Sequence, residues 1–338
     1  AWTADFALTV NELRSQVGYA AIAIAVFYCG GGDISRWRVW WLTLLVATLA
    51  VFVAESAREA LAPALGLRAW DGGVGAYSTH LAIVAPLVLG LAWPAPWGAA
   101  RGPLALTAAL AVLFAAAWDS GNRIVWAAFF ASFAVAVVAR NYSALASTHR
   151  NGSRRVTFAA MVVIVVLFSA TAWQRDGFLS HSTTGFALQS DARGPASLQA
   201  DLRPRIWAAA LEEWRKAPWL GQGFGREIAA RQLRVLTPTG GGHPDVLHAH
   251  NLFLNIVVQL GVVGLALFAA ILTFTAREFV ASLREPAAAP AGILGLSVLA
   301  GFLVKNLTDD FMHRHNALVF WAVIAALLAL ARARRAAP

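Results

Sequence analysis

Cysteine and charged residues are scarce in this sequence, and each scarcity excludes a class of protein. Among 338 residues there is one cysteine, Cys29, and 13% of the residues are charged, whereas 59% are hydrophobic. A single cysteine excludes an intramolecular disulfide and a cysteine-rich metal site. So little charge on so apolar a chain excludes an ordinary soluble globular protein. The composition therefore predicts an all-α integral membrane protein.

Long apolar runs recur along the chain and predict about nine transmembrane helices. The runs cover residues 18–29, 39–54, 79–93, 104–118, 124–139, 156–173, 252–275, 293–304 and 317–331. Several are shorter than the roughly 20 residues that cross a hydrocarbon core. Flanking Trp, Gly and Ser residues extend them, and several end in Trp, as helices do at a membrane interface.

Basic residues follow every second apolar run. They are Arg36, Arg38, Arg101, Arg140, Arg150, Arg154, Arg155, Arg277, Arg284, Arg332, Arg334 and Arg335. Because short cytoplasmic loops are enriched in Lys and Arg, this side is predicted to be the cytoplasm. The segments 1–16, 55–78, 119–123, 174–249 and 305–316 are then external. An external N-terminus with an odd helix count is unusual, so an odd number of further helices is expected upstream of Ala1.

The net charge of +9 does not indicate a nucleic-acid partner. The arginines of the chain are scattered between apolar runs. This distribution is typical of the loops that orient a membrane protein, whereas a DNA-binding face needs clustered basic residues. The chain is expected to have three parts: N-terminal transmembrane helices in residues 1–173, an external loop subdomain in 174–249, and C-terminal transmembrane helices in 250–338.

The external loop is predicted to contain an amphipathic helix over residues 202–214. Apolar residues recur there at helical spacing, Pro204 suits a first helical turn and Pro218 ends the helix. Such a helix is expected to lie on the membrane surface.

Arginine is also frequent on the predicted external side. The set is Arg123, Arg175, Arg193, Arg203, Arg205, Arg215, Arg226, Arg231 and Arg234. Since the planar guanidinium suits phosphate and pyrophosphate, the set indicates an anionic lipid headgroup as ligand. Ion pairs with nearby Asp and Glu residues are the alternative for any single arginine.

Residues 248–264, HAHNLFLNIVVQLGVVG, lead from a polar loop into a membrane helix. At about 100° per residue, Gly261 falls roughly 20° and Gly264 roughly 40° from the direction of His250. One stripe of a regular helix would then carry a histidine at the membrane surface and two glycines below it, where another helix could approach. A neutral imidazole at that place can take a proton from a hydroxyl group or orient it.

The stretch has the order His, Asn, nine residues, Gly, two residues, Gly, which resembles the signature of the O-antigen ligase and polymerase superfamily. Two further features are similar to that superfamily. Arg203 stands four residues before Trp207, ahead of the segment PWLGQG at residues 218–223, and residues 119–123, DSGNR, end in arginine at the start of an earlier helix. This chain departs from the pattern by the second arginine Arg205 and by the inserted Trp219.

The resemblance implies a type C glycosyltransferase-like fold in the bacterial inner membrane, with its active site facing the periplasm. It implies transfer of O-antigen polysaccharide from undecaprenyl pyrophosphate to lipid A-core, with inversion and without metal, ATP or another cofactor. His250 would be catalytic, together with Arg203 or Arg205 at the diphosphate. The expected substrate-binding residues are Arg123, Arg193, Asn251 and Trp207.

Several alternatives stay open. An O-antigen polymerase and a protein O-oligosaccharyltransferase are similar and differ in acceptor. A transporter is expected to place charges near the bilayer midplane, which this chain does not. The glycines at 221, 223 and 225 fit a turn better than a dinucleotide loop, because no strand precedes them. His243, His248 and His250 lack a recognised metal-ligand spacing. Asp309 and Asp310 either line the same cavity as His250 or belong to a solvated loop.

Overall fold

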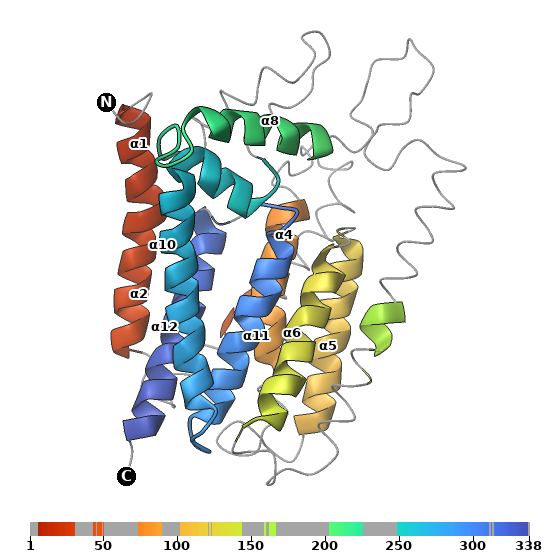
Figure 1. The fold of residues 1–338 in the computed structure, drawn as a ribbon. Coiled ribbons are helices and arrows are strands. Elements are labelled where there is room, and N and C mark those ends of the chain that lie inside the picture. Colours follow the sequence, from red (N-terminus) through yellow and green to blue (C-terminus); the bar gives the residue numbers. More distant parts are fainter. Residues whose placement is uncertain are drawn as a thin grey trace, which may run out of the picture. The chain divides into compact units, whose positions relative to one another are not determined.

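The protein is predominantly helical in the part that its computed structural model describes. That part comprises residues 6–30, 43–44, 46–48, 50, 74–89, 102–120, 122, 124–143, 159, 162–166, 203–225, 249–310, 312 and 314–336. The elements are α1 (Phe6–Glu12), the π-helix η1 (Leu13–Gly18), α2 (Tyr19–Gly30), α4 (Val74–Val88), α5 (Gly102–Asp119), α6 (Ile124–Asn141), α8 (Arg203–Lys216), α10 (Leu252–Ser282), α11 (Ala289–Lys305) and α12 (Arg314–Ala336) (Figure 1). No strand occurs among the described residues, which confirms the all-α class for them.

Three of the described helices are long and apolar enough to cross a membrane. They are Ile124–Asn141, Leu252–Ser282 and His315–Ala336, and α2, α4, α5 and α11 contain shorter apolar helices. All of these coincide with predicted apolar runs. The runs at 39–54 and 156–173 lie largely outside the described residues, so the count of about nine and the orientation stay predictions.

The described residues pack as two units, each assembled from segments that are distant in the chain. One unit is drawn from Ala1–Tyr19, Leu167–Thr273 and Asn306–Arg314, and the other from Ala20–Val166, Phe274–Lys305 and His315–Pro338. Helix α10 passes from the first unit into the second. The predicted divisions at residues 173 and 249 follow the order of the chain and remain predictions.

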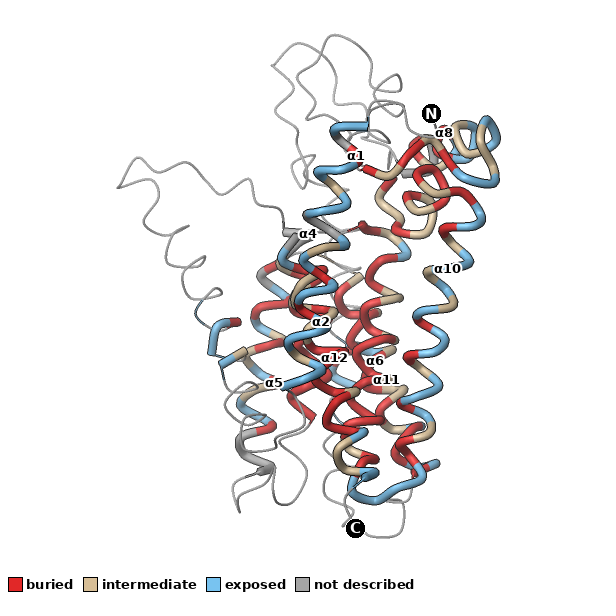
Figure 2. The backbone as a smooth tube through the Cα atoms, turned by 90° about the vertical axis from the view of Figure 1, so that its left-hand side faces the viewer, coloured by how far each residue is buried: buried red, intermediate tan, exposed pale blue. Residues whose placement is uncertain are grey.

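In the second unit, α11 packs against α4 and α6, and its glycines allow the close approach. A Cβ at Gly301 would meet the side chain of Ser132 and would lie 3.2 Å from the carbonyl oxygen of Ala128 on α6. A Cβ at Gly295 would meet the ring of Phe279. Half of the residues of α6 and most of those of α11 are buried (Figure 2). In a membrane, the hydrophobic effect does not drive helices together. Close packing at small residues such as these glycines holds the helices against one another instead.

In the first unit, α8 begins at Arg203 and ends at Lys216, which confirms the amphipathic helix with Pro204 in its first turn and Pro218 just after its end. Its apolar side belongs to a small core formed by Ile206, Ala209, Ala210, Ala249 and Val258, against which Trp214 and Leu254 also pack. The start of α10 covers this side of the helix, because Leu254 and Val258 offer apolar side chains there. The expectation that the helix lies on the membrane surface stays a prediction.

Helix α10 is not one regular helix, because Gly261 breaks it with φ 65° and ψ −166°. A Cβ at Gly264 would consequently meet the side chain of Leu260, four residues earlier. In a straight helix those two Cβ positions lie about 6 Å apart. His250 also lies outside the helix, two residues before its first residue. The predicted single stripe through His250, Gly261 and Gly264 is therefore wrong.

A tight turn, residues 218–223, inserts into the break, and we call it the elbow. The amide N–H groups of Gln222 and Gly223 donate to the carbonyls of Val258 (2.8 Å) and Gln259 (3.0 Å). In return, the N–H groups of Val262 and Val263 donate to the carbonyls of Pro218 (2.9 Å) and Trp219 (3.2 Å). The elbow thus replaces two internal hydrogen bonds of the helix with four bonds of its own.

Glycine is required on both sides of this contact. A Cβ at Gly261 would meet the backbone of Trp219, and a Cβ at Gly221 would meet the backbone of Gln259. Gly221, Gly223 and Gly225 all have positive φ, which confirms that this glycine run forms a turn. The N–H of Gly225 donates to Oε1 of Gln259 and closes the turn at 2.9 Å.

Candidate active site

His250 occupies a strained backbone position immediately before α10. Its φ is 49°, the only positive value at a non-glycine residue in the described part of the chain. Side chains disfavour this left-handed conformation by about 1–2 kcal/mol. Such a strained conformation persists only when the surrounding structure holds it in place, and strained residues cluster at functional sites.

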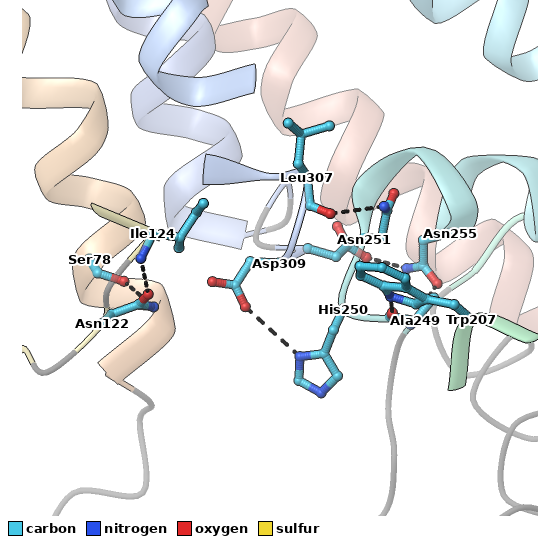
Figure 3. A network of polar contacts seen from close by, with 11 residues as sticks. Ser78, Asn122, Ile124, Trp207, Ala249, His250, Asn251, Asn255, Leu307 and Asp309 are labelled. Atoms are coloured by element: carbon cyan, nitrogen blue, oxygen red, sulfur yellow. Dashed lines mark hydrogen bonds and ion pairs between the residues drawn. The ribbon is translucent and has the colours of Figure 1, made fainter. Parts of the chain in front are cut away.

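The residue before His250 is held from both directions (Figure 3). The indole N–H of Trp207 on α8 donates to the carbonyl of Ala249 at 2.9 Å. The amide N–H of Ala249 donates to Oδ1 of Asn255 on α10 at 3.3 Å. Since both backbone groups of Ala249 are fixed, the direction of the chain entering His250 is fixed as well.

The segment 306–310, between α11 and α12, is tied to the start of α10. The N–H of Leu252 donates to the carbonyl of Asn306 at 3.0 Å. Asn251 caps the helix: its Oδ1 accepts from the N–H of Leu254 at 3.0 Å, and its Nδ2 donates to the carbonyl of Leu307 at 2.9 Å. Residues on both sides of His250 are thus anchored.

Asn255 links the same segment to the backbone at His250. Besides accepting from Ala249, its Nδ2 donates to Oδ2 of Asp310. The side chain of Asn255 is buried, as is that of Asp310. The amide side chain of Asn255 thus donates one hydrogen bond and accepts another. Buried polar atoms generally have such partners.

Asp309 is the charged partner of the candidate catalytic histidine. Its Oδ1 lies 3.8 Å from Nδ1 of His250, and the side chains are 6% and 36% exposed, respectively. At this distance the contact is electrostatic, and a small movement would make it a hydrogen bond. A carboxylate on Nδ1 favours the tautomer in which Nε2 can accept a proton. The arrangement places a partly exposed imidazole beside a buried carboxylate.

The burial of Asp309 and Asp310 decides between the two sequence interpretations of this segment. Both side chains are buried and both face residues at the start of α10, so the solvated-loop interpretation is wrong for them. Asn255 was missed from the sequence, although an amide one turn after Asn251 in an apolar run is a signal that could have identified it. Among the residues described, no three His, Cys, Asp or Glu side chains lie close enough to hold a metal ion.

The structure describes only some of the remaining predicted site residues. Arg203 and Arg205 lie in the first turn of α8, and Trp207 follows one turn after Arg203. Arg123 and Arg193 lie outside the described residues. Next to Arg123, Asn122 precedes α6: its Oδ1 accepts from the N–H of Ile124 at 3.2 Å and its Nδ2 donates to Ser78 at 3.0 Å.

The fold and this site define a class: a helical membrane protein with a supported histidine beside a broken membrane helix. Residues 108–269 match the family model described as O-antigen ligase. The match supports the resemblance to the O-antigen ligase superfamily that the sequence predicted. A similar relative is the Pseudomonas aeruginosa protein named "O-antigen ligase", which is 31% identical over 135 residues. The match covers 39% of this chain and 31% of the relative, so the chain spans about a third of the relative's length.

Proposed function

We propose that the protein is an O-antigen ligase of the bacterial inner membrane, active on the periplasmic face. It transfers O-antigen polysaccharide from undecaprenyl pyrophosphate to a sugar hydroxyl of lipid A-core. The observation that carries this proposal is the supported imidazole of His250 inside the region that matches the family. The donor's diphosphate supplies the energy of transfer, so no ATP or metal enters the scheme.

In the proposed reaction, the acceptor hydroxyl oxygen attacks the anomeric carbon opposite the diphosphate, which inverts the centre. The bond between the anomeric carbon and the diphosphate oxygen breaks, and undecaprenyl pyrophosphate leaves. Nε2 of His250 takes the hydroxyl proton, and Asp309, near Nδ1, stabilises the imidazolium that forms. The imidazole returns the proton to solvent or product before the next cycle.

The arginines of the scheme hold the departing diphosphate and stabilise its growing charge. Arg203 is the better candidate of the two in α8, because it lies one helical turn before Trp207 and hence on the same side of the helix. Trp207 in turn is bonded to the residue that precedes His250. Arg123 and Arg193 are proposed to complete the site, with Asn251 near the acceptor.

A related transferase is the second candidate, because the same chemistry serves other acceptors. An O-antigen polymerase would use a second undecaprenyl-linked chain, and a protein O-oligosaccharyltransferase would use a hydroxyl side chain. A transporter is disfavoured because the charged residues of this chain gather at helix ends and in one large external loop, not near the bilayer midplane.

The test is reconstitution of purified protein with undecaprenyl pyrophosphate-linked O-antigen and lipid A-core, without ATP and with a chelator present. A gel that resolves both lipids is expected to show a ladder on lipid A-core. Longer chains on the undecaprenyl carrier would assign polymerase activity instead. No change in either lipid, from protein shown to be folded, would refute transfer between these substrates.

The Asn255–Asp310 contact gives a sharper prediction within this scheme. Asn255→Asp places two buried carboxylates against each other, which costs stability and displaces the segment beside His250. We expect transfer to fall by about a hundredfold, as misplacement of a reacting group by about 1 Å does. The double variant Asn255→Asp with Asp310→Asn exchanges donor and acceptor and restores every hydrogen bond of the contact.

The measurement is the transfer rate per folded protein for the wild type, each single variant and the pair. Recovery in the double variant to within about tenfold of the wild type is the expected result, since only the position of the amide has changed. A double variant no more active than Asn255→Asp would show that Asn255 does not act through Asp310.

A further inference from the structure

The elbow lies at a depth where a loop is not expected. Between Leu252 and Arg277, α10 contains no charged residue, and the helix is a candidate membrane span. A hydrocarbon core about 30 Å thick takes up about 20 residues of helix at 1.5 Å each. After the break, only the 15 residues from Val262 to Ala276, about 22 Å of helix, precede Arg277, so with Arg277 at one boundary the core extends about 8 Å past Gly261.

The elbow is paired to α10 at that same level. Its residues Pro218 and Trp219 accept hydrogen bonds from Val262 and Val263, directly after the break. In a backbone hydrogen bond, the donor nitrogen and the acceptor oxygen lie about 3 Å apart. Residues 218–223 therefore share the depth of Gly261, inside the apolar layer.

The side chains of the elbow continue the lipid-facing surface of α10. Val263, Leu267 and Ile271 recur every four residues and are exposed, so they form one apolar stripe of the spanning helix. In the elbow, Trp219 is 69% and Leu220 56% exposed, next to the upper end of this stripe. Trp207 and Trp214 differ from Trp219, since each donates its indole N–H to a backbone carbonyl inside the unit.

The hydrogen bonds of the elbow also meet the requirement that the bilayer imposes. Where no water is present, an interrupted helix is tolerated only if other groups take over the freed N–H and C=O groups. The carbonyls of Val258 and Gln259 and the N–H groups of Val262 and Val263 are all bonded to the elbow. A water-exposed loop would not need this complete replacement.

We propose that the elbow is a re-entrant membrane element whose Trp219 and Leu220 contact phospholipid acyl chains. It enters the same leaflet as the first turns of α10 and returns within six residues. The proposal concerns lipid contact alone and holds whether or not the protein is a ligase.

The single cysteine makes the test direct. With Cys29 replaced by serine, a nitroxide is attached to cysteine at position 219, 220, 263 or 267, and at Glu212 on α8, an exposed residue, as the water-facing control. The protein is placed in vesicles of phosphatidylethanolamine and phosphatidylglycerol that contain no polyprenyl lipid. Power-saturation EPR then compares the accessibility of each label to oxygen, which concentrates in the acyl region, and to a water-soluble nickel complex.

Labels at Trp219→Cys and Leu220→Cys are expected to match Val263→Cys and Leu267→Cys, with high oxygen and low nickel accessibility. The label at Glu212→Cys is expected to show the reverse. The two α10 positions report in the same experiment that the protein is folded and inserted. If labels at 219 and 220 follow Glu212→Cys while those at 263 and 267 remain in lipid, the elbow is outside the membrane and the proposal is wrong.

Discussion

Removal of the imidazole at position 250 is expected to abolish transfer while the protein still folds. A positioned general base contributes about a hundredfold to ten-thousandfold, so the activity of His250→Gly should fall by at least about a thousandfold. Glycine is a better probe than alanine, because φ at this position is 49° and glycine adopts this conformation without strain. The rate of chain transfer to lipid A-core, corrected for folded protein, measures the effect.

Two further substitutions separate the imidazole from the backbone. His250→Ala also lacks the imidazole but retains about 1–2 kcal/mol of left-handed strain, so it should unfold at a lower temperature than His250→Gly. His250→Asn tolerates the conformation and offers a hydrogen-bonding side chain without a suitable base. All three variants should be equally inactive. Near wild-type transfer by folded His250→Gly would remove the catalytic role from this residue.

Local signals in the sequence located the parts of the site that depend on neighbouring residues. The limits of α8 followed from apolar spacing and two prolines, and the turn at 221–225 followed from its glycines. The start of α10 near His250 followed from the change from polar loop to apolar run. Each of these depends on short-range geometry that one segment determines alone.

The features that the sequence did not predict correctly, or did not predict at all, are those in which a distant segment decides the structure. Periodicity showed that α8 has an apolar side but not what covers it, and the start of α10 covers it. The regular stripe through Gly261 failed because the elbow, about forty residues earlier, supplies hydrogen bonds that a helix normally makes with itself. Asp310 and Asn255 are likewise brought together by tertiary structure, which spacing along the chain does not reveal.

Gly261→Ala and Gly221→Ala are each expected to destabilise the first unit strongly. At Gly261, φ 65° with ψ −166° belongs to a region that only glycine occupies readily. An added Cβ would in addition meet the backbone of Trp219, which cannot rotate away as a side chain could. Together these effects should cost about 3 kcal/mol or more, a loss that lowers both the yield of monodisperse protein and its unfolding temperature.

Gly30→Ala is the matched control, because nothing lies within 4 Å of a Cβ at this helical glycine. It makes the same chemical change in an apolar helix and should leave stability within about 1 kcal/mol of the wild type. Thermal unfolding in detergent compares the three variants. Because Gly221 and Gly261 are the two sides of one contact, their combined substitution should destabilise by less than the sum of the single effects. Additive losses, or wild-type stability of either single variant, would mean that the elbow does not hold the broken helix together.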